Sequence, residues 1–203
     1  MAYIQMKHSY KRYKTGDLEI IANNDVSFDI EKGELVVILG ASGAGKSTIL
    51  RSLNYLEQPD SGTITIDDFK VDFKTITKEQ ILTLRRKLAM VFQQFNLFPN
   101  MTVKENITLS PIKTKGVSKA DAEAKAKELL EKVGLKDKAD AYPTSLSGGQ
   151  QQRVAIARTL VADSPVILAD EPTGNLDSGT EDEIIEILKT SAHKHGKCVI
   201  VVT

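Results

Sequence analysis

The sequence has a single cysteine and lacks both a long hydrophobic run and an apolar leader. Cys198 lies in the apolar segment 198–202, where we expect a small core residue rather than a reactive thiol or a metal ligand. No run reaches the roughly 18 apolar residues that predict a membrane-spanning helix. Residues 1–13 are polar and have no hydrophobic centre, so we expect no signal peptide and a cytoplasmic location.

The sequence also has no excess of charge of either sign. Its 203 residues include 27 basic and 27 acidic side chains, a formal net charge of zero. Dedicated nucleic-acid binders are usually basic, so this balance predicts no nucleic-acid partner. With 41% hydrophobic residues, the chain can bury one sizeable core and has room for a second lobe.

What the sequence does contain is a glycine-rich loop between an aliphatic run and the start of a helix. The run 35–39 predicts a buried strand, and residues 49–56 repeat with helical spacing. Between them the spacing Gly-x4-Gly-Lys-Ser matches a phosphate-binding P-loop. The candidate phosphate-binding residues are Gly40, Ala41, Ser42, Gly43, Ala44, Gly45, Lys46, Ser47 and Thr48.

Each residue type in this loop has a physical reason to be there. Glycines allow positive φ angles, so backbone N–H groups can turn inward around phosphate oxygens, and the following helix adds the positive end of its dipole. We expect Lys46 to reach the β- and γ-phosphates of a bound nucleotide and the Ser47 hydroxyl to bind Mg²⁺. The alternative is a glycine-rich turn without a ligand, but the flanking strand and helix favour the phosphate site.

A pair of carboxylates follows another aliphatic run far along the chain. Residues 166–169 predict a buried strand that ends in Asp170 and Glu171. We expect Asp170 to hold Mg²⁺ beside Ser47, and Glu171 to act as the general base that activates water. The alternative is two solvated charges at a strand end, and the P-loop elsewhere in the chain favours the metal site.

A third motif, Ser147-Gly148-Gly149-Gln150, precedes a helix with no charge in its first turn. Such a terminus exposes backbone N–H groups to an anion. The alternative is a tight turn between two helices. Because the chain already has one phosphate-binding helix terminus, we favour a second phosphate contact at these residues.

The order of the expected elements predicts an α/β fold. Strands at 26–30, 63–66, 88–92 and 199–202 join those already described, and capping boxes beginning at Thr77 and Ser178 mark two of the helices. Ser118 is the expected cap of another. We predict a single domain: a P-loop NTPase core with a mostly parallel sheet and an N-terminal antiparallel β subdomain at 1–93 and 163–203, and an inserted α-helical subdomain at 94–162.

Leu146-Ser147-Gly148-Gly149-Gln150 resembles the signature sequence of the ATP-binding-cassette (ABC) ATPases, and companion motifs follow in the family's order. Residues 40–47 are similar to its Walker A motif and 166–170 to its Walker B motif, with Glu171 as the catalytic glutamate. Gln93 matches the Q-loop glutamine, and 175–177, which includes Asp177, matches the D-loop. Tyr13 aligns with the aromatic residue that stacks on adenine in this family.

The resemblance implies an enzyme that binds and hydrolyses ATP with Mg²⁺. Lys46, Gln93 and Glu171 are then the catalytic residues, and Ser47, Gln93 and Asp170 hold the metal. It also implies a head-to-tail homodimer that sandwiches two ATP molecules, with the P-loop of one chain facing residues 147–149 of the other.

A membrane partner is implied as well. Gln93 lies at the hinge between the lobes, where it would sense the γ-phosphate and move the helical lobe against an integral membrane permease on its cytoplasmic face. We expect the permease contact near Phe95, Leu97 and Phe98. The alternative is that these three side chains only pack within the lobe.

The resemblance is mixed along the chain. Residues 54–158 are similar to ATPases of polar amino-acid importers, whereas residues 1–47 and 171–177 look more like the macrolide-exporter and lipoprotein-release branch. A natural chain and a mosaic or engineered chimera are both open. Thr203 ends the sequence where the family places its switch histidine next, so we expect a truncated C-terminal end and poor hydrolysis.

Three functions follow from these motifs. The leading one is the ATP-hydrolysing subunit of a membrane transporter. A soluble cassette ATPase that acts on DNA or ribosomes is the second, although such proteins usually carry a long coiled-coil insertion or a second cassette. The third is a truncated or engineered nucleotide-binding cassette with little hydrolysis and no transport role.

Overall fold

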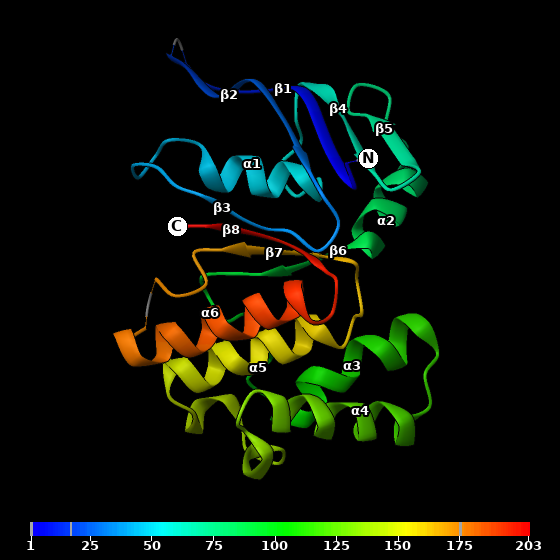
Figure 1. The fold of residues 1–203 in the computed structure, drawn as a ribbon, viewed down its shortest axis with the longest axis vertical. Helices are drawn as coiled ribbons and strands as arrows, with labels where there is room; N and C mark the ends of the chain where they lie inside the picture. The colour runs from blue at the N-terminus through cyan, green and yellow to red at the C-terminus, as the bar shows by residue number, and fades with distance from the viewer. Residues whose placement is uncertain (1, 17, 175) are drawn as a thin grey trace.

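A computed structural model describes residues 2–16, 18–174 and 176–203, and the strands within them form two four-stranded sheets (Figure 1). One sheet is parallel and has the strand order β3-β8-β7-β6. Its strands are β3 (Leu35–Ile38), β6 (Leu88–Val91), β7 (Val166–Asp170) and β8 (Cys198–Val202). Because all four strands run the same way, the loops that follow them meet at one edge of the sheet.

The second sheet is antiparallel, with the order β2-β1-β4-β5. Its strands are β1 (Ile4–Thr15), β2 (Leu18–Ile30), β4 (Ser61–Ile66) and β5 (Phe69–Asp72). The sequence predicted only parts of β2 and β4. The pairing of β1 with β2 contains register shifts between residues 6 and 12, and such bulges break the alternation of apolar and polar residues by which a strand is predicted.

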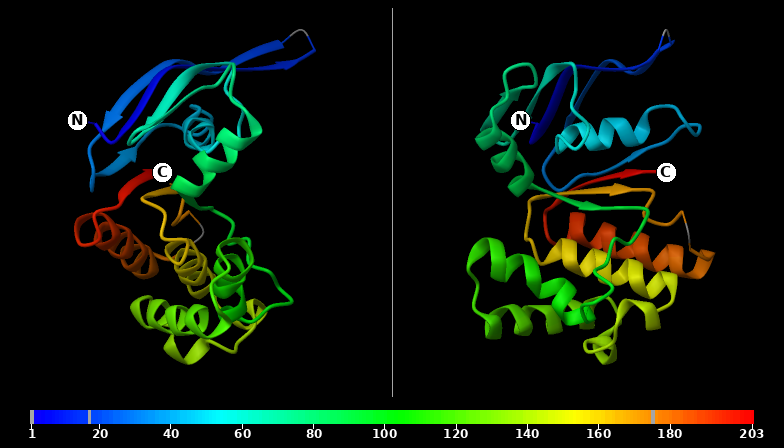
Figure 2. Two further views of the ribbon diagram at one scale, coloured as in Figure 1. Left: turned by 90° about the vertical axis from the view of Figure 1, so that its right-hand side faces the viewer. Right: turned by 180° about the vertical axis from the view of Figure 1, so that it is seen from behind.

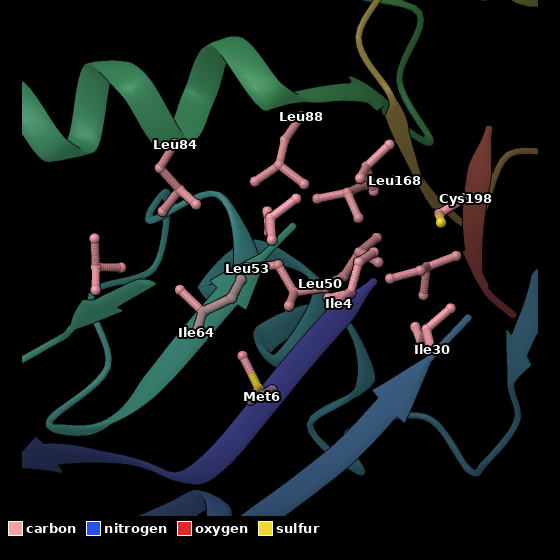
Figure 3. Packing of buried hydrophobic residues seen from close by; sticks show 14 of the residues in the cluster. Ile4, Met6, Ile30, Leu50, Leu53, Ile64, Leu84, Leu88, Leu168 and Cys198 are labelled. Atoms are coloured by element: carbon pink, nitrogen blue, oxygen red, sulfur yellow. The ribbon is translucent and has the colours of Figure 1, made fainter. Parts of the chain in front are cut away.

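The main core lies between the two sheets and surrounds α1 (Lys46–Leu53), which is visible between them in both views of Figure 2. Leu50 and Leu53 of α1 are fully buried. They belong to one apolar cluster with Ile4 of the antiparallel sheet and Leu168 of the parallel sheet (Figure 3). The helix that begins at the glycine-rich loop is thus held on both sides.

Helices cover the opposite face of the parallel sheet. α5 (Gly148–Leu160) and α6 (Ser178–His193) lie against it, and a second apolar core joins α5 to α3 (Val103–Lys115) and α4 (Lys119–Lys132) (Figure 1). Two short 3-10 helices, η1 (Lys136–Lys138) and η2 (Pro143–Ser145), complete this part. α2 (Lys78–Lys87) begins with the predicted capping box at Thr77, and α4 with the predicted cap at Ser118.

The sequence pattern did not predict α3. Its buried face includes polar Asn106, whose side-chain amide bonds the carbonyls of Phe98, Met101 and Thr102 at 3.0–3.1 Å. Pro111 lies inside the same helix. A buried face that carries an asparagine and a proline has no apolar stripe, so helical periodicity does not reveal it.

Two local predictions are wrong. β3 was expected to be buried, but it is the edge strand of the parallel sheet, and Val37 is 48% exposed. The capping box from Ser178 to Glu181 is absent. Asp177 caps α6 by accepting a hydrogen bond from the Thr180 N–H at 3.0 Å, and Glu181 instead accepts one from the Thr173 hydroxyl at 3.1 Å.

The predicted fold class is confirmed: an α/β core with a parallel sheet, an antiparallel β subdomain and added helices. Cys198 is fully buried in the main core, as predicted, and burial raises the pKa of its thiol. Across the part of the chain that the structure describes, no helix combines the length and the apolar character needed to cross a bilayer.

Candidate functional site

The loop between β3 and α1 leaves the helix N-terminus open to a ligand. Gly45 caps α1 with a φ of 86° and has no side chain to bond the first-turn N–H groups. α1 also carries no acidic residue in that turn. A Cβ atom on Gly45 would overlap the carbonyl of Ala22 in β2, so the close approach of these two backbones requires glycine. The uncapped N–H groups and the helix dipole together favour an anion.

Lys46 holds its ammonium group inside this loop. Its Nζ donates to the carbonyl oxygen of Gly40 at 2.7 Å and to that of Ala41 at 3.0 Å, and the residue is 8% exposed. The partners of this ammonium among the described residues are neutral carbonyls, and a largely buried cation in such surroundings attracts an anion. The positive charge and the open helix terminus therefore lie at the same loop.

Asp170, at the end of β7, faces the first turns of α1. Its Oδ1 accepts a hydrogen bond from the Ser47 hydroxyl at 2.7 Å, and its Oδ2 accepts two from Arg51, at 3.0 Å from Nε and 2.9 Å from Nη2. The Asp170 side chain is 3% exposed, so this carboxylate is buried and paired. A carboxylate and a hydroxyl are the oxygen donors that Mg²⁺ prefers.

Glu171 and Gln93 gather next to Gly174. A Cβ atom on Gly174 would lie 3.2 Å from Gln93 Nε2 and 3.5 Å from Glu171 Oε2. Glu171 has a φ of 45°, a left-handed conformation that is costly for a residue with a side chain. Gln93 follows β6 and Glu171 follows β7, the adjacent parallel strand, which brings the two side chains to the same edge of the sheet.

Tyr13 lies on β1, and its hydroxyl is close to Thr48 of α1. Its hydroxyl donates to Glu57 Oε2 at 2.6 Å, and Lys11 Nζ lies 4.9 Å from the centroid of its ring. Burial raises the pKa of Tyr13, the bond to Glu57 adds to the rise, and hydrogen bonding with Thr48 opposes it. The ring is therefore held beside the helix that begins at the P-loop.

The motif at 147–150 lies in the other lobe. Ser147 caps α5 through a reciprocal capping box: its hydroxyl accepts from the Gln150 N–H at 3.3 Å, and Gln150 Oε1 accepts from the Ser147 N–H at 3.0 Å. Gly149 is buried, and a Cβ atom there would overlap Thr180. Among the described residues, the polar partners and close neighbours of this motif do not include the P-loop.

Asp177 links the third motif to α6. It caps that helix through Thr180, and the Thr180 side chain is the one that packs on Gly149. Asn175, the other polar residue of the D-loop resemblance, lies outside the described residues.

Sequence reasoning missed two residues that contact the site. Arg51 lies four positions after Ser47, on the same face of α1, so helical spacing was a signal that could have placed it near Asp170. Gln152, two positions after the signature motif, bonds only backbone carbonyls, which no sequence pattern marks.

Comparisons with known proteins agree with this geometry. Residues 23–174 match the family model described as "ABC transporter". The chain is 47% identical to the glutamine transport ATP-binding protein GlnQ of Geobacillus stearothermophilus, over 97% of this chain and 78% of that protein. It is 44% identical to the methionine import ATP-binding protein MetN 1 of Yersinia pestis, over 98% of this chain but only 57% of that protein.

Among solved structures, it superimposes with a TM-score of 0.88 on a dimeric ATP-binding cassette in a post-hydrolysis state with ADP and Pi bound. The sequence identity is 41%, over 98% of this chain and 87% of that one. A family match over most of the chain, close relatives and a shared fold point to one conclusion. The chain belongs to the ABC transporter family and is an ATP-binding cassette ATPase.

Proposed function

We propose that this chain is the ATP-hydrolysing subunit of a membrane importer for a polar amino acid. The observation that carries the proposal is the meeting of Ser47 and Asp170 beside the buried ammonium of Lys46. This arrangement joins a phosphate cradle to a set of oxygen donors suited to a divalent cation. The relative named for glutamine transport supports this substrate class, and the relative named for methionine import supports amino-acid import more broadly.

The residues fit ATP with Mg²⁺. The N–H groups at the start of α1 and the Lys46 ammonium bind the β- and γ-phosphates, and Tyr13 supplies an aromatic surface for adenine. Ser47, Asp170 and Gln93 hold Mg²⁺, which when bound neutralises charge that develops on the phosphates. Glu171 takes a proton from the attacking water, and Gln93 lies next to it.

The site is completed by a second copy of the chain in head-to-tail orientation. Ser147 is exposed at the N-terminus of α5, which carries no acidic residue in its first turn. That terminus suits an anion that its own P-loop does not supply. A partner's γ-phosphate meets this requirement, and the dimeric cassettes among the similar structures support it.

The contact with a membrane permease centres on Phe98. Phe98 is 47% exposed, whereas Leu97 packs against the helical core and Phe95 is half-buried next to Gly148. The three side chains therefore divide between the two interpretations of the sequence. Phe98 is free for a partner, while Leu97 stabilises the lobe.

Two measurements test the proposal. Equilibrium binding of a fluorescent ATP analogue, with and without Mg²⁺, should show tighter binding with the metal, followed by release of inorganic phosphate. Co-expression with a permease of a polar amino-acid importer should yield a complex whose ATPase activity rises when a polar amino acid and the importer's binding protein are added. Nucleotide binding with the same affinity with and without Mg²⁺ would contradict the proposed metal site. ATPase activity that only a macrolide or a lipoprotein stimulates would contradict the proposed substrate class.

A further inference from the structure

Gln152 joins the signature helix to two catalytic loops. It lies in the second turn of α5 and is completely buried. Its side-chain Nε2 donates to the carbonyl oxygen of Phe92 at 3.2 Å and to that of Pro172 at 2.8 Å. An amide nitrogen has two protons, so this geometry uses its full donor capacity.

Both carbonyls belong to residues adjacent to proposed catalytic side chains. Phe92 directly precedes Gln93, and Pro172 directly follows Glu171. These two side chains meet next to Gly174. One buried amide thus connects the backbones that aim Gln93 and Glu171, and it does so from a third element, α5, which lies beneath β6 and β7 (Figure 1).

Gln152 carries a cost together with its two donated bonds. Its Oε1 is buried and has no hydrogen-bond partner in the described structure. An unpaired buried acceptor costs free energy, and an apolar side chain of similar length would avoid that cost only by leaving the carbonyls of Phe92 and Pro172 without this donor. The amide therefore has a use that compensates for its orphaned oxygen, and the two donated bonds supply it.

We propose that Gln152 is a positioning residue for ATP hydrolysis. It fixes the loop after β6 relative to the loop after β7, so that the Gln93 amide and the Glu171 carboxylate keep one relative placement. It also ties both loops to the helix whose N-terminus is Ser147, five residues earlier. Gln152 is completely buried and bonds the two loop carbonyls, so it acts through Gln93 and Glu171.

The test is Gln152→Met, which keeps the side-chain length and removes both donated bonds. We expect kcat for ATP hydrolysis to fall about ten- to a hundredfold, because small misplacements of catalytic groups have effects of this size. We expect the KM for ATP and the dissociation constant of ATP to stay within about twofold, because Lys46 and the P-loop are untouched. This split between kcat and KM separates positioning from a general loss of folded protein.

Two control variants each remove another side-chain hydrogen bond that α5 makes to a backbone carbonyl. Thr159→Val removes another bond from α5 to the backbone of β6, from Oγ1 to the Met90 carbonyl at 3.3 Å, but upstream of both catalytic loops. Gln151→Met alters the adjacent glutamine, whose amide bonds the Leu146 carbonyl at 3.1 Å. Both variants should hydrolyse ATP within about twofold of the parent. If Thr159→Val loses as much activity as Gln152→Met, the role of Gln152 is only to anchor α5.

A second variant serves if Gln152→Met does not fold. Gln152→Asn keeps a buried amide but shortens the side chain by one methylene group, so the amide cannot reach both carbonyls. The same loss of kcat at unchanged KM would support the proposal. A parent-like kcat in either folded variant would overturn it. Absence of ATP hydrolysis by the parent itself would instead count against the proposed function.

Discussion

The Ser47 hydroxyl and the Asp170 carboxylate, 123 residues apart, lie 2.7 Å from each other. They meet because Ser47 lies in the first turn of the helix that follows β3, while Asp170 ends β7, a strand of the same parallel sheet. The fold thereby places two oxygen donors at the carboxyl edge of the sheet, next to the glycine-rich loop that precedes α1.

Replacing Arg51 tests whether its positive charge stabilises the buried carboxylate of Asp170. Arg51→Met leaves Asp170 with one hydrogen-bond partner among the described residues, the Ser47 hydroxyl, and a buried carboxylate without its cation is destabilising. Because the Arg51 side chain is 49% exposed, the expected loss in free energy of unfolding is limited to about 1–3 kcal/mol. Urea denaturation in EDTA measures the loss, and millimolar Mg²⁺ should recover part of it.

The matched control is Arg12→Met, which removes a cation whose Nη1 lies 3.6 Å from Glu19 Oε1, with both side chains well exposed. This variant should change stability by less than about 0.5 kcal/mol. Equal stability of Arg51→Met and the parent would show that Asp170 does not depend on Arg51.

Gly45 and Gly43 allow a comparison between two sources of strain. Both have positive φ, but only at Gly45 would a Cβ atom meet another group, the Ala22 carbonyl. Gly43→Ala should cost about 1 kcal/mol of unfolding free energy, from the left-handed backbone alone. Gly45→Ala should cost clearly more, about 2 kcal/mol or above, because β2 must also move. Equal denaturation midpoints for Gly43→Ala and Gly45→Ala would contradict the close approach of the Gly45 and Ala22 backbones.

Asp177 caps α6, and its replacement should separate that role from any contact with nucleotide. Asp177→Ala should lower the melting temperature by about 2–4 °C, whereas Asp177→Asn should nearly preserve it, because asparagine also caps helices. The bond from the Thr180 N–H holds the pKa of Asp177 below its ordinary value of 3.8.

The pH dependence of this cap has a definite sign. A carboxyl group with a depressed pKa in the folded state stabilises the protein above the unfolded pKa, and the effect disappears as the pH falls through the folded pKa. The difference in melting temperature between the parent and Asp177→Asn should therefore change only below about pH 4. A change confined to neutral pH would contradict the capping role.

The sequence predicts the strand, glycine-rich loop and helix around Lys46 because their signal is local. Glycine spacing, Lys46 and Ser47 lie within one loop and one helix turn, and parallel-strand topology then brings Asp170 to the same edge. The position of Arg51 follows from helical spacing once the helix is known. The positions of these residues can therefore be predicted from helical periodicity and from the connection rules of parallel sheets.

Other features depend on contacts that the sequence does not mark. Gln152 bonds two backbone carbonyls, and every residue has such an acceptor. The cap of α6 was placed one residue late because Asp177 and Ser178 are both good caps. The structure decides between them through Thr173, which bonds Glu181 and so prevents the capping box. Tertiary partners, rather than local preference, determine both results.

Lys46→Ala should weaken ATP binding by at least about a hundredfold, because it removes a charge-assisted contact from a site where the ammonium is already largely buried. Isothermal titration with ATP and Mg²⁺ measures the change. Lys189→Ala, an exposed lysine of α6, is the control and should bind as the parent does. Comparable dissociation constants for Lys46→Ala and the parent would remove the P-loop from the nucleotide site.

Glu171→Gln should separate nucleotide binding from hydrolysis. Glutamine has the size of glutamate but cannot accept a proton from water, so kcat should fall about a hundred- to ten-thousandfold. The backbone at this position is held by its own bonds, from the Glu171 N–H to the Val202 carbonyl at 2.9 Å and from the Gly174 N–H to the Glu171 carbonyl at 3.2 Å. The left-handed turn should therefore persist, and ATP should bind with parent-like affinity.

Because Glu171→Gln no longer consumes bound ATP, the ATP-sandwiched dimer should accumulate and elute as a dimer in gel filtration with ATP and Mg²⁺. Glu181→Gln, in which the side chain can still accept from Thr173, is the control and should hydrolyse ATP at the parent's rate. If Glu171→Gln turns over at the parent's rate, another group is the base; if it binds ATP but stays monomeric, the head-to-tail dimer is wrong.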